Sequence, residues 1–425
     1  MSPLLQHAQR LREHRRHREA IAALHQHLAA DPDDFKGHFE LALTRLSEGE
    51  DHRSALTDIE RAIALSPDAA IAHALRSAIL NRLERHAEAI QSADEALALD
   101  PEMPFAWFCR GNALLGLRKL PEAEDAARKA LALDPDDSSA SNLLATVLRL
   151  SGRLDEAAVE IERDLARDPE NAWTFATSGW TALHQGDRKK AEELFRESLR
   201  LDASLEHARL GLRESFKARS VLYRIYLRWV FFLQRYSEKS QWMVFIGIYI
   251  AYRFGRALLA MIHPLAAVPL IVAYLLFCFG GWLASGIGHF LMLSDPMARL
   301  TLNAEEKRDG LLVGGLFFSG LILLIAGVTA LPIGLAFVGG LMMGAAIPGS
   351  LVFDNPSVKG RILFGIVTSG VLLCAAMVLY HSVIHPSGVS VFEGPAGLPF
   401  SLAMIAVMLT TWIGGIPSLR HATPK

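Results

Sequence analysis

The chain has 425 residues, and its 43 Lys/Arg and 45 Asp/Glu give a formal net charge of −2. This balance is unlike the strongly basic surface of nucleic-acid-binding proteins, so we expect no nucleic-acid partner. Cys109, Cys278 and Cys374 are too far apart in the sequence to suggest a metal site or a disulfide framework, and we expect no metal and no other cofactor.

Charged residues divide the chain into two parts of different character. Residues 1–241 hold 34 Lys/Arg and 39 Asp/Glu, whereas residues 242–425 hold only 9 and 6. The first part therefore has the composition of a water-soluble domain, and the second has that of a membrane domain. The N-terminus lacks the apolar core of a secretory signal peptide, so we expect the first part to stay in the cytoplasm.

The first element in chain order is a repeat with a period of 34 residues. The stretch ALALDP occupies Ala96–Pro101 and returns unchanged at Ala130–Pro135. Each unit has two apolar-periodic stretches around a short polar turn, which predicts a helical hairpin. Proline ends each unit because it cannot continue a helix, and such hairpins bury their apolar faces only by stacking. A parallel series of small residues keeps the same register: Ala55, Ala89, Ala123, Ala157 and Ala191.

These features resemble the tetratricopeptide repeat (TPR) family. The unit at 104–137 carries the family's residues in order and spacing: Trp107, Gly111, Leu114, Ala123, Ala130 and Pro135. The resemblance implies six units, at about 1–35, 36–69, 70–103, 104–137, 138–171 and 172–205. The expected fold class is all-α, with a TPR helical-hairpin solenoid in residues 1–205 followed by a polytopic transmembrane helix bundle.

The resemblance also implies a peptide-binding groove, because TPR proteins often bind extended peptides along the first helices of their repeats. Asn112 matches the family's frequent groove asparagine, whose amide can donate to and accept from a peptide backbone. The basic residues of the family's carboxylate-binding members are mostly absent, and Arg82 and Arg149 could serve only partly. The alternative to a groove is that these residues form ordinary surface or pack between repeats. This alternative applies above all to the two tryptophans. The groove candidates are Asn81, Arg82, Phe105, Phe108, Asn112, Asn142, Arg149, Trp173 and Trp180.

Residues 206–241 are interpreted as a capping helix followed by a basic amphipathic helix. Cations placed at steps of seven and four share one stripe of a helix, with aromatic and aliphatic residues on the other faces. This pattern is typical of a helix that lies in a membrane interface and contacts anionic lipid, although a helix that only closes the repeat stack is the alternative. The cations are Lys217, Arg224, Arg228, Arg235 and Lys239.

Residues 242–418 are expected to form the transmembrane domain, with a short tail at 419–425. Five apolar stretches have the length of a span: 264–291, 311–330, 331–352, 362–384 and 398–416. A sixth, at 241–262, contains Arg253 and Arg256, which are costly at mid-bilayer. Basic connections alternate across the membrane when six spans are present, with both termini in the cytoplasm, so six spans are favoured and five remain the alternative.

The apolar part carries little that suggests chemistry. Its carboxylates, including Asp309, are expected to fall in the connections, which disfavours an ion-coupled transporter. Ser369 is followed by His381 and His385 on one predicted helix, roughly 18–24 Å along its axis, which disfavours an intramembrane hydrolase. We therefore assign no catalytic residue and expect a protein that is not an enzyme.

The resulting hypothesis is a membrane-anchored scaffold or adaptor for protein–protein interaction. Its cytoplasmic TPR domain would capture a protein segment at the membrane, and the membrane half could contact another integral membrane protein. The alanine-, arginine- and leucine-rich composition suggests a bacterial chain and therefore the inner membrane. The whole chain also resembles bacterial proteins that combine TPR units with membrane spans. The alternative is a membrane enzyme or transporter whose TPR half recruits substrate or regulates access.

Overall fold

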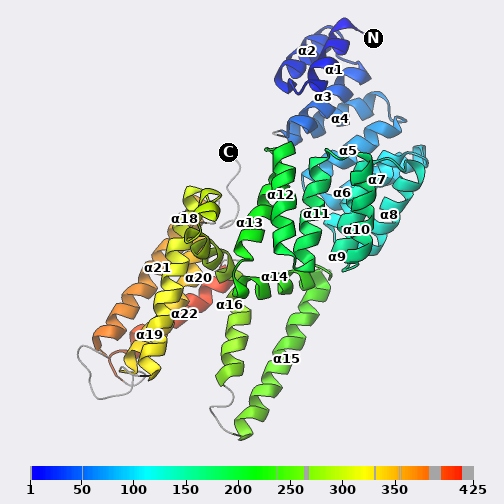
Figure 1. Ribbon diagram of the computed structural model, residues 1–425. Helices are drawn as coiled ribbons and strands as arrows, with labels where there is room; N and C mark the ends of the chain where they lie inside the picture. Colours follow the sequence, from blue (N-terminus) through cyan, green and yellow to red (C-terminus); the bar gives the residue numbers. More distant parts are fainter. Residues whose placement is uncertain are drawn as a thin grey trace. The chain divides into compact units, whose positions relative to one another are not determined.

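The structure is a computed structural model that describes residues 2–49, 51–236, 238–262, 268–329, 332–353, 355, 357–381 and 394–413. All regular elements in these residues are helices, which confirms the all-α fold class (Figure 1). The chain divides into two compact units, and the division passes through α13–α15. Here α13 is Glu206–Lys217, α14 is Val221–Leu233 and α15 is Glu238–Ile262. The first unit is Met1–Leu212 with Phe231–Val244, and the second is Arg213–Val230 with Phe245–Lys425.

The first unit consists mainly of consecutive helix pairs that follow one another from α1 to α12 (Figure 1). The two helices of a pair pack together, and the first helices of neighbouring pairs also contact one another, as α5 does with α7 and α9 with α11. The helices are α1 (Pro3–Glu13), α2 (His17–Ala30), α3 (Phe35–Glu48), α4 (His52–Leu65), α5 (Ala70–Arg82), α6 (His86–Leu99), α7 (Pro104–Gly116), α8 (Leu120–Leu133), α9 (Ser138–Leu150), α10 (Leu154–Arg167), α11 (Ala172–Gln185) and α12 (Arg188–Leu201).

Aspartate-proline pairs end four of the second helices, α2, α6, α8 and α10, as the repeat predicts. Asp100 is the C-cap of α6 and Asp134 is the C-cap of α8, and a proline follows each of them directly. Polar N-caps begin several first helices: the Asp137 carboxylate accepts a hydrogen bond from the Ser139 backbone, and the Asn171 side chain accepts one from the Thr174 backbone. Several pairs therefore have local start and stop signals in their sequence.

Small residues hold the paired helices close together. Ala89 and Ala123 are fully buried, and a Cβ added at Gly111 would lie 2.9 Å from Cδ2 of Leu143. Ser77 stands where the best unit has Gly111, and its hydroxyl donates to the Ala89 carbonyl at 2.7 Å. The alanine register of the sequence thus marks the points where helices meet.

A second register lies in the turns inside the pairs. Within two residues of the end of each first helix, one residue has a positive φ: Arg15, Gly49, Glu84, Arg118, Gly152 and Gly186. The spacing is that of the repeat, and three of the six are not glycine. A left-handed conformation costs such residues roughly 1–2 kcal/mol, so these turns retain strain.

The remaining helices follow in chain order and end in an apolar bundle. They are α13 (Glu206–Lys217), α14 (Val221–Leu233), α15 (Glu238–Ile262), α16 (Val268–Leu293), α17 (Pro296–Leu300), α18 (Ala304–Asp309), the π-helix η2 (Gly310–Gly314), α19 (Gly315–Thr329), α20 (Gly334–Phe353), α21 (Val358–Leu379) and α22 (Gly397–Ile413).

Three described helices are long and apolar enough to cross a membrane: Ala304–Thr329, Gly334–Phe353 and Val358–Leu379. Phe277–Leu293 and Gly397–Thr411 are shorter apolar helices. Parts of the predicted segments lie outside the described residues, namely 264–267, 330–331, 382–384, 414–416 and the tail at 419–425. The choice between five and six spans therefore stays a prediction.

Gly320 and Gly339 allow α19 and α20 to pack closely in the bundle. The spacing of Gly340 and Gly344 predicts a small-residue contact, but a Cβ added at Gly340 would meet no described atom within 4 Å. The adjacent Gly339 instead lies against the Gly320 backbone, and a Cβ at Gly320 would be 2.7 Å from the Gly339 carbonyl oxygen. The helix contact is shifted by one residue because Gly339 is on the face that α20 turns toward α19.

The expectation that Asp309 lies in a connection is wrong. It belongs to the apolar helix Ala304–Thr329, is 4% exposed, and has its Oδ2 atom 2.9 Å from Nδ1 of His289 on α16. The charge pattern could not reveal this pair, because its two residues are separated by 20 positions. Ser369 donates its hydroxyl to the Gly365 carbonyl in its own helix, while His385 lies outside the described residues.

Candidate functional site

The predicted groove residues lie on four of the first helices, which are neighbours in the stack. Asn81 and Arg82 are on α5, Asn112 is on α7, Arg149 is on α9 and Trp180 is on α11. Because these helices contact one another in order, their side chains can form one continuous surface. The structure nevertheless gives the candidates different surroundings, and only some of them line an open hollow.

Asn81 and Asn112 come together in an open cleft of about 330 Å³, which we call the asparagine cleft. The side-chain carbonyl of Asn81 accepts a hydrogen bond from Nδ1 of His86 at 2.7 Å, so this side chain is held in place. Asn112 is half-buried and lines the same hollow. The cleft is lined by Asn81, His86, Asn112, Leu115, Gly116, Arg118 and Leu150.

Arg118 is a cleft residue that the sequence interpretation missed. It follows α7 in the turn, has a φ of 57°, and lines the asparagine cleft. Partial burial lowers the pKa of its guanidinium below the usual value. Arg118 lies 34 residues before Gly152 in the turn register, but no feature of the sequence shows which turn residue lines the cleft.

Asn142 lies between repeats and not on an open groove surface. It is 4% exposed, and its amide nitrogen donates to the Ser138 carbonyl at 2.8 Å, to Oγ1 of Thr174 at 2.8 Å and to Oδ2 of Asp164 at 3.2 Å. These bonds join α9, α10 and α11. We therefore correct the prediction that Asn142 lines the groove. Its side chain is buried, and the carbonyl of Ser138, Thr174 and Asp164 already accept its amide hydrogens.

The two tryptophans pack against the helix that follows the repeats, which was the alternative interpretation. Trp173 stacks on the His207 ring of α13 with centroids 5.0 Å apart, although its side chain remains exposed. Trp180 donates from Nε1 to the His207 carbonyl at 3.3 Å and meets the Phe195 ring edge to face at 5.6 Å. Both residues therefore hold the start of α13 against the last pair.

The two phenylalanine candidates are half-buried on α7. Their rings stack with centroids 6.3 Å apart. Phe105 packs against buried alanines that include Ala74 and Ala96, and Phe108 packs against the apolar cluster of α7–α10. Both contribute to packing between repeats, and part of each ring remains accessible.

Arg149 is a buried cation at the end of α9. It is 7% exposed, and its Nη1 donates to Nε2 of His184 at 2.7 Å. Its Nε atom has no hydrogen-bond partner among the described residues. Burial, and then the charge of Arg118, lower the pKa of Arg149 to about 10. Arg82 differs, because its side chain is exposed on α5.

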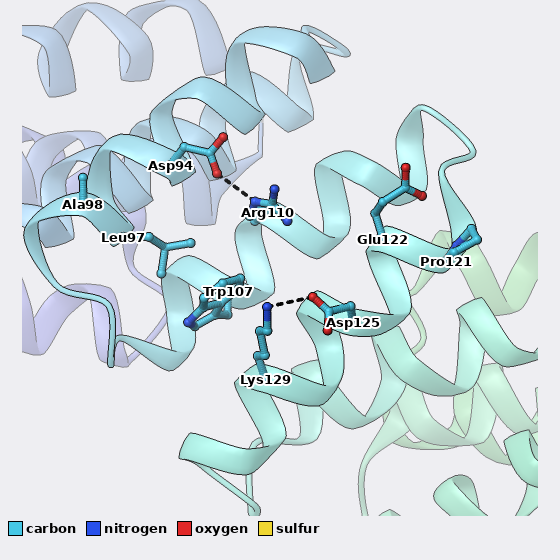
Figure 2. Close-up of a pocket in the computed structure, with 9 residues that line it drawn as sticks. All are labelled: Asp94, Leu97, Ala98, Trp107, Arg110, Pro121, Glu122, Asp125 and Lys129. Atoms are coloured by element: carbon cyan, nitrogen blue, oxygen red, sulfur yellow. Dashed lines mark hydrogen bonds and ion pairs between the residues drawn. The ribbon is translucent and has the colours of Figure 1, made fainter.

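A second hollow, of about 730 Å³, lies between α6, α7 and α8 and is drawn in Figure 2. Trp107 forms its apolar wall, with Nζ of Lys129 4.5 Å from the ring centroid. Arg110 pairs with Asp94 at 2.7 Å and Lys129 pairs with Asp125 at 2.8 Å, so the cations seen in Figure 2 already have carboxylate partners. Satisfied ion pairs make this pocket a weaker candidate than the asparagine cleft.

The predicted basic stripe is divided among several elements. Lys217 ends α13, Arg224 and Arg228 lie on α14, and Arg235 follows α14. Lys217 is 8% exposed and pairs with Glu214 at 3.1 Å. The prediction that all five cations lie on one stripe of a single helix is therefore wrong, because the helix ends at Lys217. Arg224 and Arg228 are exposed, and the Lys239 side chain lies outside the described residues.

Several solved structures are similar to the chain. TTC0263, a thermophilic TPR protein in Thermus thermophilus, has 16% sequence identity and a TM-score of 0.40, over 43% of this chain and 98% of that chain. A tetratricopeptide repeat protein from Parabacteroides merdae has 17% identity and a TM-score of 0.45, over 50% and 82%. The pilF protein of Pseudomonas aeruginosa has 22% identity and a TM-score of 0.40, over 51% and 96%. Among curated proteins, no sequence matches significantly.

A family comparison identifies the repeats. The sequence profile described as tetratricopeptide repeat matches residues 5–50, 44–104 and 110–172. The match agrees with the alanine register, the helix pairs and the aspartate-proline stops. The helix pairs within residues 5–172 are therefore tetratricopeptide repeats.

Proposed function

We propose that this protein is a membrane-anchored scaffold whose asparagine cleft captures an extended segment of another protein. The observation that carries the proposal is the meeting of Asn81 and Asn112 in one open cleft. An asparagine amide can donate to one peptide group and accept from the next, which suits an extended backbone. The TPR fold itself suggests a protein–protein interaction scaffold.

The anchoring half of the proposal is supported by the apolar helices. Ala304–Thr329, Gly334–Phe353 and Val358–Leu379 have the length and composition of membrane spans. We propose that they hold the protein in a bacterial inner membrane with the TPR domain in the cytoplasm. The exposed cations Arg224 and Arg228 on α14 would contact anionic lipid, to which each contributes about 1 kcal/mol.

We propose no catalytic role for either half. The repeats supply a recognition surface, and the scaffold function requires only binding and anchoring. The membrane half could contact a second integral membrane protein through faces that the bundle leaves exposed, as at Ile322 and Ile366.

A photocrosslinking experiment in the full-length chain tests the capture. A benzophenone amino acid replaces Leu115, which lines the asparagine cleft, and the matched control carries it at the exposed Val159 on α10. We expect discrete protein adducts from position 115 that disappear when Asn112→Leu is added. Equal adducts from both positions, or adducts that survive Asn112→Leu, would contradict capture through the cleft.

A further inference from the structure

Two arginines of the second unit lie on an exposed part of an apolar helix. Arg253 and Arg256 belong to α15, and both side chains are exposed. Neither has a hydrogen bond or an ion pair with any residue that the structure describes. Exposed apolar residues of the same helix surround them: Ile246, Ile250, Phe254 and Leu258. We call the two arginines and these four residues the arginine face.

Another side of α15 packs against α16 and leaves the arginines uncovered. The Tyr252 ring stacks on the Tyr274 ring with centroids 4.0 Å apart, and a Cβ added at Gly255 would lie 3.1 Å from Cδ2 of Leu270. Arg253 and Arg256 each follow one of these contact residues by one position, which turns them about 100° around the helix axis. The contact with α16 therefore does not neutralise them.

The depth of Arg253 makes an uncovered charge unfavourable. In the six-span prediction α15 is the first span, and Arg253 lies nine positions before its end at Ile262, roughly 14 Å along the axis. The hydrocarbon core of a bilayer is about 30 Å thick, so Arg253 would lie close to its middle. Intramembrane arginines almost always face the interior of a bundle and pair with another group. An exposed arginine at this depth therefore requires a partner from outside the described bundle.

The carboxylates of the second unit are already in use. Each one whose side chain the structure describes lies at ion-pair distance from a lysine, an arginine or a histidine. The pairs are Glu214–Lys217, Asp295–Arg219, Glu305–Arg361, Glu306–Arg213 and Asp309–His289. The described part of the unit therefore has cations in excess, and a complementary partner must bring a carboxylate of its own.

A membrane-spanning helix with an acidic residue fits this face better than a lipid or a second copy does. A lipid phosphate lies at headgroup depth, whereas a carboxylate on a spanning helix can lie at the depth of Arg253. A symmetric contact between two copies would place the same arginines on both sides of the interface, where like charges repel. Charge and depth together favour a helix from a different protein.

We propose that the arginine face binds a transmembrane helix of another integral membrane protein through an aspartate or glutamate at the depth of Arg253 and Arg256. A guanidinium can hold a carboxylate with two parallel hydrogen bonds, and the apolar residues of the face would pack along the partner helix. This inference rests on the proposed membrane anchoring, with α15 as a span, and it names the surface and the chemistry of the integral membrane partner.

Association of a synthetic transmembrane peptide with the full-length chain tests the arginine face. The chain carries a donor fluorophore at its C-terminus in phosphatidylcholine liposomes, and the acceptor-labelled peptide is polyleucine with one central aspartate. We expect saturable energy transfer whose apparent affinity falls about ten-fold in Arg253→Leu and in Arg256→Leu, and is retained in Arg253→Lys, because the pair needs a cation. A peptide with asparagine at the centre should bind about ten-fold more weakly.

The matched control is Lys359→Leu, which removes another exposed cation, at the start of α21, and should bind the aspartate peptide as the wild type does. Both arginine variants remove a charge from an exposed apolar surface, so we expect them to fold. The same unfolding midpoint in wild type and variants would show that a change in affinity comes from the face itself.

Three outcomes would overturn the proposal. Equal affinity of the wild type and both arginine-to-leucine variants for the aspartate peptide would show that the arginines bind no carboxylate there. Loss of peptide binding when phosphatidylglycerol replaces phosphatidylcholine would assign the arginines to lipid headgroups. Energy transfer between two differently labelled copies of the chain that requires Arg253 would assign the face to self-association.

Extraction of membranes with sodium carbonate separates this inference from the proposed anchoring. A chain that stays in the membrane while the aspartate peptide ignores both arginines would keep the anchoring and lose the partner helix. A topology with only five spans would take α15 out of the bilayer and remove the inference, again with the anchoring intact. Release of the chain into the supernatant would remove the anchoring and the inference together.

Discussion

At the residue scale, the turns inside the TPR units retain backbone strain. Glu84 has a φ of 60° at the position where the second unit has Gly49, with a φ of 82°. The Glu84 side chain is exposed, so its replacement removes little else. The strain was not visible in the sequence, because a polar turn such as ERHAEA does not show which residue is left-handed.

We predict that Glu84→Gly stabilises the protein by about 0.5–1 kcal/mol, since relief of the left-handed strain exceeds the added freedom of the unfolded chain. Urea unfolding followed by tryptophan fluorescence measures the change. The matched variant Gly49→Ala has open space around the new Cβ and should lose about 1 kcal/mol through backbone strain alone. An unchanged midpoint in both would contradict the assigned turn geometry.

His184 makes stability depend on pH, again at the residue scale. Its folded pKa of about 2 is far below the unfolded value of about 6.5. The unfolded state therefore binds a proton below about pH 6.5 that the folded state excludes, and stability falls as the pH drops. We expect a loss of about 1–2 kcal/mol between pH 7 and pH 5.

Thermal unfolding at the two pH values, compared between wild type and His184→Asn, measures this contribution. The variant should lose less stability on acidification, because asparagine does not titrate. An equal loss in both proteins would assign the acid sensitivity to other groups.

At the scale of elements, the helices themselves were predictable and their contacts only partly so. The period of the alanines and the aspartate-proline stops predicted the helix pairs, since both signals are local. The partners of Asn142 and of the tryptophans come from later helices and required the folded stack. In the bundle, the spacing of Gly340 and Gly344 indicated a contact, but the rotation of α20 brings Gly339 to α19 instead.

We predict that Gly339→Leu lowers the stability of the bundle by about 1–3 kcal/mol, because overpacking forces α19 and α20 apart. The neighbouring Gly340→Leu should change it little, since open space surrounds that position. The midpoint of unfolding of the purified protein in mixed detergent micelles measures both. A larger loss of stability for Gly340→Leu than for Gly339→Leu would contradict the assignment of Gly339 to the contact with α19.

At the scale of the whole molecule, charge divides the sequence after residue 241, whereas the structure assigns Arg213–Val230 and Phe245–Lys425 to one unit and Phe231–Val244 to the other. Two helices, α13 and α14, occupy the range where a capping helix and a basic helix are expected, but Lys217, which was expected in the basic stripe, ends α13 and pairs with Glu214. The sequence could not show this break, because Lys217 and Arg224 keep helical spacing across the residues where the helix ends.

The number of spans is tested by topology. We predict that alkaline phosphatase fused after residue 390 is active, because six spans with a cytoplasmic N-terminus place this connection outside. A green fluorescent protein fusion at the same point should be dark, and fusions after residue 305 should show the opposite pattern. Fluorescence at 390 would contradict six spans.

By itself, the sequence determined the repeat, the all-α class and the apolar half. These follow from periodicity and composition, which act over one or two helices, whereas the groove asparagines were implied by the resemblance to the TPR family. Only the tertiary structure decided that Asn142 is buried, that His289 meets Asp309, and that Arg149 has a buried nitrogen without a partner among the described residues. Such pairings depend on the rotation of each helix about its axis, because that rotation sets which side chains from distant parts of the chain meet.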